Sequence, residues 1–151
     1  YQRAAVIKAW INRKIRYFNT GEELPMSLDT TRADPAYLLG RLFATLEKIQ
    51  EDASNGSLNR TIKDSYFTSA AATPAAIFPR LLKLSHHHQR KLSTGLQIAR
   101  NRLIQEIMST MQEFPTMLSL EQQGIFYIGY YHQRQDFFTS KNQNEATVSA
   151  K

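Results

Sequence analysis

The chain has 151 residues, of which 42% are hydrophobic, so it is long enough for one domain with a buried core. It has no cysteine, which excludes disulfides and thiolate metal sites, and no run of about 18 apolar residues, so we expect no membrane span. Its 19 Lys and Arg outnumber 13 Asp and Glu, a formal net charge of +6. Without a secretory signal or cysteine, the chain suits the cytoplasm. Because it begins at Tyr1 rather than methionine, we expect a piece of a longer protein or a subunit without its first residues.

Apolar residues recur at helical spacing from the first residues onward. Residues 1–18 predict a helix that ends at 19–21, where Gly21 provides a C-terminal cap. The polar segment 20–34 predicts a surface crossover, or alternatively a partner-binding loop. Asp34–Pro35 predicts the start of a second helix, because a capping side chain precedes proline at the first helical position. The apolar face of this helix, with Arg41 and Lys48 outside it, consists of Leu38, Leu39, Leu42, Phe43, Leu46 and Ile49.

The middle of the chain predicts two more helices. The third covers about 59–71. The fourth begins at Thr73–Pro74, with the threonine hydroxyl as cap, and ends near 93–95. Pro79 lies close enough to its start to be tolerated. The buried stripe of the fourth helix is predicted to contain Ile77, Phe78, Leu81, Leu82, Leu84 and Leu92.

The last third of the chain predicts a fifth helix over about 96–113 and a sixth that starts at the capping box Ser119–Gln122. The sixth helix is apolar around most of its circumference, which is typical of a helix buried between neighbours. It is predicted to end near Phe138, before the polar residues 139–151. The sequence therefore predicts an all-α fold, a single helical bundle of about six helices at residues 1–138, followed by a disordered C-terminal tail.

The net charge lies in one central segment. Residues 65–105 contain six Lys and Arg but no Asp or Glu, and subtracting these six from 19 leaves 13 basic residues against 13 acidic ones. A field concentrated in this way suggests a polyanionic partner. A basic face that is merely solvated is the alternative. Helical spacings of three and four place these side chains on one face of the fourth helix: Arg80, Lys83, His87, Arg90 and Lys91.

Three further basic residues lie outside the fourth helix. Arg102 of the fifth helix and Lys63 of the third are secondary candidates for nucleic-acid binding. Arg100 lies between apolar positions, so we expect it to be half-buried and paired with a carboxylate. The aromatic residues of the sixth helix favour core packing, although Tyr130, Tyr131 and Arg134 are also candidates for stacking on unpaired bases.

The sequence gives no positive argument for catalysis. Consecutive helical residues point about 100° apart, so His86, His87 and His88 would not close on one metal ion. His132 and Asp136 are one helical turn apart, which could be an oriented base, but no nucleophile accompanies them, and we favour a surface hydrogen bond as the explanation. There is no glycine-rich phosphate loop and no Gly-x-Ser-x-Gly motif. We expect a protein that is not an enzyme and has no catalytic residue, metal, cofactor or small-molecule substrate.

Four blocks of the sequence resemble a known family in order and spacing. They are YLLGRLFATLE at 37–47, TPAAIFPRLL at 73–82, Phe114–Pro115 with LSLEQQG at 118–124, and GYYHQR at 129–134. Together they resemble the C-terminal helical region of the type I-C CRISPR Cascade large subunit. The same bundle occurs in that family as a separate small subunit made by internal translation initiation. A chain that starts just before the bundle favours the small subunit or an excised domain.

The resemblance implies the partners and the role. In the family this bundle supports the hybrid of guide RNA and target DNA and the displaced strand during R-loop formation, beside the backbone and large subunits of Cascade. Guide complexes leave sequence reading to base pairing and contact mostly the nucleic-acid backbone. We therefore expect the candidate residues to neutralise phosphates of displaced single-stranded DNA. One alternative is a scaffold whose basic face docks on acidic neighbouring subunits; another is a nuclease, which the lack of carboxylate clusters disfavours.

Overall fold

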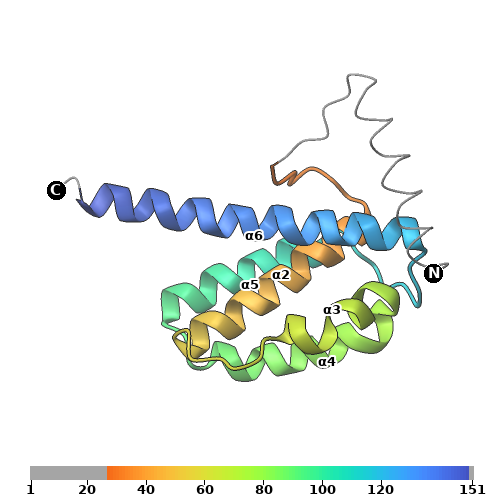
Figure 1. Cartoon of the computed structure of the whole chain (residues 1–151), viewed down its shortest axis with the longest axis horizontal. Helices are drawn as coiled ribbons and strands as arrows, with labels where there is room; N and C mark the ends of the chain where they lie inside the picture. The colour runs from red at the N-terminus through yellow and green to blue at the C-terminus, as the bar shows by residue number, and fades with distance from the viewer. Residues whose placement is uncertain (1–26, 150–151) are drawn as a thin grey trace, which may run out of the picture.

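The computed structural model describes the backbone of residues 27–149 and the side chains of residues 27–141. This part of the chain forms five helices and no strand, which confirms the predicted all-α class. None of these five helices has the length and apolar content to span a bilayer. The helix predicted at 1–18 lies outside the described residues. The five helices are α2 (Pro35–Ser54), α3 (Ile62–Ala72), α4 (Pro74–Gln89), α5 (Thr94–Ser109) and α6 (Leu120–Ser149) (Figure 1).

Helix α2 is the centre of the bundle. It contacts each of the other four helices, and residues 36–47 are all buried. Arg41, which we predicted to lie outside the apolar face, is 1% exposed. The prediction treated α2 as a helix with one solvent face, whereas neighbours cover it on several sides. Its polar positions therefore need partners inside the protein.

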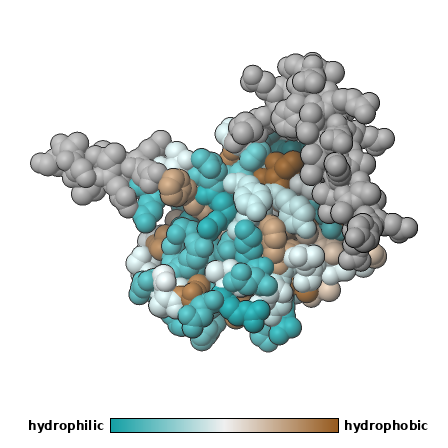
Figure 2. Space-filling view, viewed as in Figure 1, coloured by the Kyte–Doolittle hydropathy of each residue, from teal (hydrophilic) through white to brown (hydrophobic). Residues whose placement is uncertain are grey.

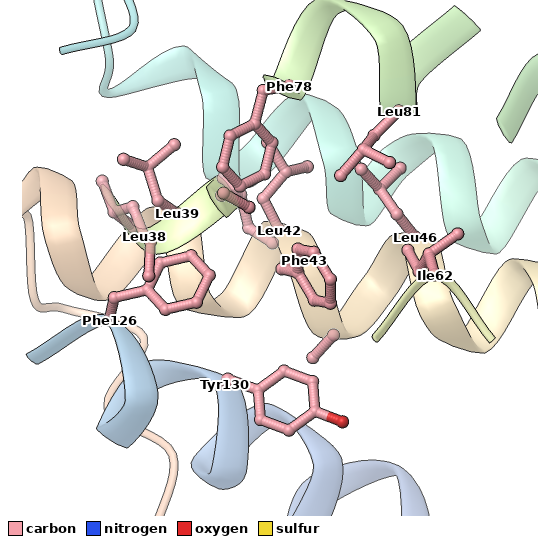
Figure 3. Packing of buried hydrophobic residues seen from close by; sticks show 14 of the residues in the cluster. Leu38, Leu39, Leu42, Phe43, Leu46, Ile62, Phe78, Leu81, Phe126 and Tyr130 are labelled. Atoms are coloured by element: carbon pink, nitrogen blue, oxygen red, sulfur yellow. The ribbon is translucent and has the colours of Figure 1, made fainter. Parts of the chain in front are cut away.

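The core joins helices on opposite sides of α2. The Phe43 ring lies between Phe78 of α4 and Tyr130 of α6, with centroid distances of 6.4 Å and 5.9 Å (Figure 3). Both pairs are edge-on, a geometry worth about 0.5–1.5 kcal/mol beyond area burial. Phe78 and Leu81 therefore fix which face of α4 turns inward, and the opposite face of α4 is left for solvent.

Two glycines allow α6 to cross α2 closely. A Cβ atom on Gly40 would overlap the backbone carbonyl of Phe126, and one on Gly129 would overlap the carbonyl of Tyr37. The expectation that α6 is buried between neighbours is wrong, because Tyr131 is 56% exposed and Phe138, two turns later, is 64% exposed.

The C-terminal end of α6 differs from the prediction. The helix does not stop near Phe138 but continues to Ser149, past the other helices of the bundle (Figure 1). A disordered tail therefore does not describe residues 139–149, whose backbone is helical. The segment contains no glycine or proline, so no residue in it ends the helix.

Local signals set the starts of the helices. Asp34 caps α2 by accepting from Ala36 N at 3.0 Å, as predicted. At α6, Gln122 N donates to Ser119 Oγ at 3.2 Å, and Ser119 N donates to the Gln122 side chain at 2.9 Å, which confirms the capping box. Helix α4 starts at Pro74 as expected. However, the Thr73 hydroxyl donates to Ser69 O at 3.0 Å and does not cap α4.

The boundary between α4 and α5 lies earlier than predicted. Helix α4 ends at Gln89, and Gly95 lies inside α5 rather than in the preceding connection. Leu84, predicted to be buried, is 36% exposed on α4. The connection after α5 is tied to the start of α4, since Ala75 N donates to Pro115 O at 3.0 Å. This contact and the short connection at Thr73 hold α4 in one orientation.

Candidate nucleic-acid interface

One face of α4 carries exposed basic side chains. The opposite face packs against α2 and α3 through Phe78, Leu81 and Ser85, which recur at intervals of three and four residues. Positions about two residues after each of these therefore point to solvent. Figure 2 shows mostly hydrophilic residues along the edge of the molecule where α4 lies. Three of the predicted basic residues lie on this face and two follow directly after the end of α4, and we call these five exposed residues the basic ridge: Arg80, Lys83, His87, Arg90 and Lys91.

The C-terminal half of the basic ridge coincides with the end of α4. Arg90 is the C-terminal cap residue, and Lys91 N donates to His88 O at 3.0 Å in the turn that follows. The free carbonyl groups at the end of a helix carry partial negative charge, which favours cations there. The basic residues thus stabilise the end of the helix that displays them.

The charge of the basic ridge is not cancelled by the residues that the structure describes. Among residues 27–141, no ridge side chain forms an ion pair with a carboxylate. Arg80 instead places its guanidinium carbon 5.6 Å from the Tyr66 ring centroid. Three arginines of the other helices behave differently: Arg41 pairs with Glu106 at 3.3 Å, Arg100 with Asp52 at 3.0 Å and Arg134 with Glu51 at 2.9 Å.

The ion pair of Arg100 confirms the expected half-burial and carboxylate partner. Its side chain is 15% exposed, and its guanidinium also lies 4.7 Å from the Phe137 ring centroid. The pair lines an open depression of about 560 Å³ between α2, α5 and α6, where Lys48 also pairs with Asp52 at 2.6 Å. Lys48 and Arg100 both have Asp52 as a carboxylate partner in this depression, and in this respect it differs from the basic ridge.

The two secondary candidates lie in different places. Arg102 is exposed on α5, which packs against α2 and has no comparable contact with α4, so Arg102 is separate from the basic ridge. Lys63 is half-buried on α3, which does pack against α4. Its Nζ lies 5.0–5.2 Å from the ring centroids of Phe67, Tyr130 and Tyr131.

The histidines of α4 are not equivalent. His86 and His87 are exposed, whereas His88 is half-buried, and its Nε2 has no hydrogen-bond partner among the described residues. Burial lowers the pKa of His88, and the nearby His87 and Lys91 lower this pKa further. His88 therefore favours the neutral imidazole more strongly than a fully solvated histidine does.

Of the three stacking candidates on α6, one is accessible. Tyr130 is 2% exposed and donates to Glu47 Oε2 at 2.5 Å. Burial raises the pKa of Tyr130, and the Glu47 carboxylate raises it further. Arg134 is held by Glu51. Tyr131 alone of the three presents most of its ring to solvent.

Two buried charged residues of α2, Glu47 and Arg41, were not predicted from the sequence. The apolar residues all around α2 were a signal of its central position.

His132 has a structural partner. Its Nδ1 lies 2.9 Å from the Tyr37 hydroxyl, and Asp136, proposed as its neighbour, is exposed one turn away. The Tyr37 oxygen also accepts from Asp29 N at 3.0 Å, so this hydroxyl links the backbone at residue 29 to His132, and the histidine tautomer decides which of Tyr37 and His132 donates. Among the described residues, no three His, Cys, Asp or Glu side chains come together as metal ligands.

A comparison with known protein families shows the family of this chain. A family model described as CRISPR-associated protein (Cas_Csd1) matches residues 1–138. The chain belongs to the Cas_Csd1 family. This match confirms the resemblance drawn from the sequence, and it identifies the chain as a CRISPR-associated component of Cascade. The matched residues include the whole basic ridge of this Cas_Csd1 chain, together with Lys63 and Arg102. A search of curated proteins found no match.

Proposed function

We propose that this Cas_Csd1 chain is a non-catalytic part of a type I-C Cascade complex and that its basic ridge binds backbone phosphates of the displaced DNA strand. Its partners are then the guide RNA–target DNA hybrid, the displaced strand and the neighbouring backbone and large subunits. Binding without sequence preference suits a guide complex, in which base pairing selects the target.

One observation carries this proposal: the ridge cations are exposed and have no carboxylate partner among residues 27–141, while Arg41, Arg100 and Arg134 are neutralised within the bundle. A cation that already has an internal partner contributes little to phosphate binding. The ridge cations release counterions from DNA when they bind it, which is the main source of sequence-independent affinity. The proposal includes no catalytic step, because the basic ridge contains cations and imidazoles but no carboxylate partner among the described residues.

The salt dependence of binding tests the proposal. The full chain is titrated onto fluorescent single-stranded DNA over a series of salt concentrations. Each lost phosphate contact reduces the slope of log affinity against log salt by about 0.7. Lys83→Glu is expected to reduce both slope and affinity. Lys141→Glu changes the net charge equally at an exposed position on α6, a helix without extensive contact to α4, and serves as the matched control.

The assembled complex gives the decisive comparison. A variant with Arg80, Lys83, Arg90 and Lys91 all replaced by Glu is expected to assemble but to load the displaced strand poorly. Normal loading by this variant refutes the proposal. A failure to assemble even without DNA instead supports the scaffold alternative, in which the basic ridge docks on acidic neighbouring subunits.

A further inference from the structure

Lys63 is held over a cluster of aromatic rings where α3 meets α6. Its Nζ is 5.2 Å from the Phe67 centroid, 5.0 Å from Tyr130 and 5.2 Å from Tyr131. These rings differ in accessibility. Phe67 is half-buried and Tyr130 is 2% exposed, but Tyr131 is 56% exposed. Tyr131 packs edge-on against Tyr130 with a centroid distance of 5.0 Å, so the exposed ring has a fixed support.

The aromatic rings position Lys63 without neutralising it. A cation over a ring face is attracted by the ring quadrupole, but the ring carries no net charge. Among residues 27–141, Lys63 forms no ion pair with a carboxylate. The cluster therefore presents one positive charge directly beside one exposed aromatic surface.

This cluster continues the basic ridge across α3. Tyr66, which lies under the guanidinium of Arg80 at 5.6 Å, is three residues after Lys63 on the same helix. Residues three apart share one face of a helix. A path therefore leads from Arg80 of the ridge over Tyr66 and Lys63 to Tyr131, and cations alternate with aromatic rings along it.

We propose that Tyr131 and Lys63 form a stacking platform for an unpaired base of the same DNA strand whose phosphates the basic ridge holds. Surfaces that bind single strands without sequence preference combine cations that follow the backbone with aromatic rings that stack the bases. In duplex DNA the bases are stacked on one another and their faces are not accessible to Tyr131. The platform rests on the proposed function and restricts its ligand to an unpaired strand.

Two oligonucleotides separate stacking from phosphate binding. One is a fluorescent thymidine 15-mer, and the other is a 15-mer of the same backbone with abasic sugars. In the full chain, Tyr131→Ala is expected to weaken binding of the thymidine strand by at least about fivefold. Binding of the abasic strand by this variant should be unchanged. Lys63→Met should instead reduce the salt slope for both strands by about 0.7.

Matched variants control for aromaticity and for folding. Tyr131→Phe keeps the ring and is expected to bind as the unchanged chain does. Phe138→Ala removes an exposed aromatic ring from the same helix, at a site where the neighbouring Arg134 is paired with Glu51, and should not weaken binding. Because the Tyr131 ring is largely exposed, Tyr131→Ala should retain the fold. A thermal unfolding midpoint close to that of the unchanged chain shows that it does.

The outcomes distinguish the two proposals. If Tyr131→Ala binds the thymidine strand normally while the ridge variants bind both strands weakly, the platform is wrong and the proposed function stands. Equal weakening of both strands by Tyr131→Ala also overturns the platform, because the effect is then not stacking. If the unchanged chain binds neither strand, both proposals are wrong.

Discussion

The hydroxyl of Tyr130 donates a hydrogen bond of 2.5 Å to the carboxylate of Glu47, and both side chains are almost completely buried between α6 and α2. The nearest cation to this carboxylate is Arg134, 3.8 Å from Glu47 Oε2. A buried charge requires such partners, because removal from water is otherwise strongly unfavourable. The pair thus fixes the register of α6 on α2, and with it the position of Tyr131.

Tyr130→Phe is expected to lower the free energy of unfolding by about 1–3 kcal/mol, because it leaves a buried acceptor without its donor. Chemical denaturation with urea measures the effect. The adjacent Tyr131→Phe removes the same hydroxyl from an exposed ring and should change the free energy of unfolding by less than about 0.5 kcal/mol. Equal effects at the two positions would show that the contact with Glu47 does not stabilise the fold.

Replacing two different glycines by alanine is expected to change the free energy of unfolding in opposite directions, because only one of them, Gly40, lies where α2 and α6 cross closely. Gly40→Ala places a methyl group against the backbone of Phe126, which has no side-chain freedom to move away. The free energy of unfolding should fall by about 1–3 kcal/mol or more. At Gly95, near the start of α5, an added Cβ has nothing within 4 Å, so Gly95→Ala should raise the free energy of unfolding by up to about 1 kcal/mol.

The helix starts were predictable because their causes are local. Asp34 and Ser119 cap helices through backbone groups two or three residues away, and the sequence displays both partners. The Thr61–Asp64 capping box of α3 carries the same kind of signal and was missed. Thr73 carries the same signal as Asp34, but its hydroxyl bonds to Ser69 O, because α3 ends directly before it and this carbonyl, which also accepts from Thr73 N at 2.8 Å, lies within reach.

Tertiary relationships were less predictable. The exposure of the basic ridge followed from its spacing against Phe78 and Leu81. The sequence did not show that α2, rather than α6, is the buried helix, because apolar residues surround both and only the packing decides which one is covered. Leu84 illustrates the same limit, since it fits an apolar stripe yet lies beyond the width of the buried face.

The environment of His132 predicts a dependence of stability on pH. Burial lowers its pKa from 6.5, and the positive charge of Arg32 lowers it further, against a smaller opposite effect of Asp29. The unfolded chain therefore takes up a proton at a higher pH than the folded chain does. With respect to this group, the free energy of unfolding should be constant well above pH 6.5 and should fall as the pH is lowered through and below that value.

Urea denaturation at about pH 7.5 and pH 5.5 measures this dependence. His88 has its pKa lowered in the same direction, so it adds to the effect. The variant with His88→Gln and His132→Gln removes both groups and should lose less stability on acidification than the unchanged chain. An equal loss in the variant would assign the dependence to other groups.

The contrast between paired and unpaired arginines predicts a separation of stability from DNA binding. Arg134 donates to both oxygens of Glu51, at 2.9 Å and 3.0 Å, so Arg134→Gln should lower the free energy of unfolding by on the order of 1 kcal/mol and leave the salt slope of DNA binding unchanged. Arg90 has no carboxylate partner within residues 27–141, so Arg90→Gln should lower the free energy of unfolding by only about 0.3 kcal/mol, through the lost charge at the end of α4, and should reduce that slope by about 0.7. Both substitutions remove one positive charge, so net charge alone would give them the same slope. The same slope in both variants would therefore show that DNA senses overall charge rather than the ridge.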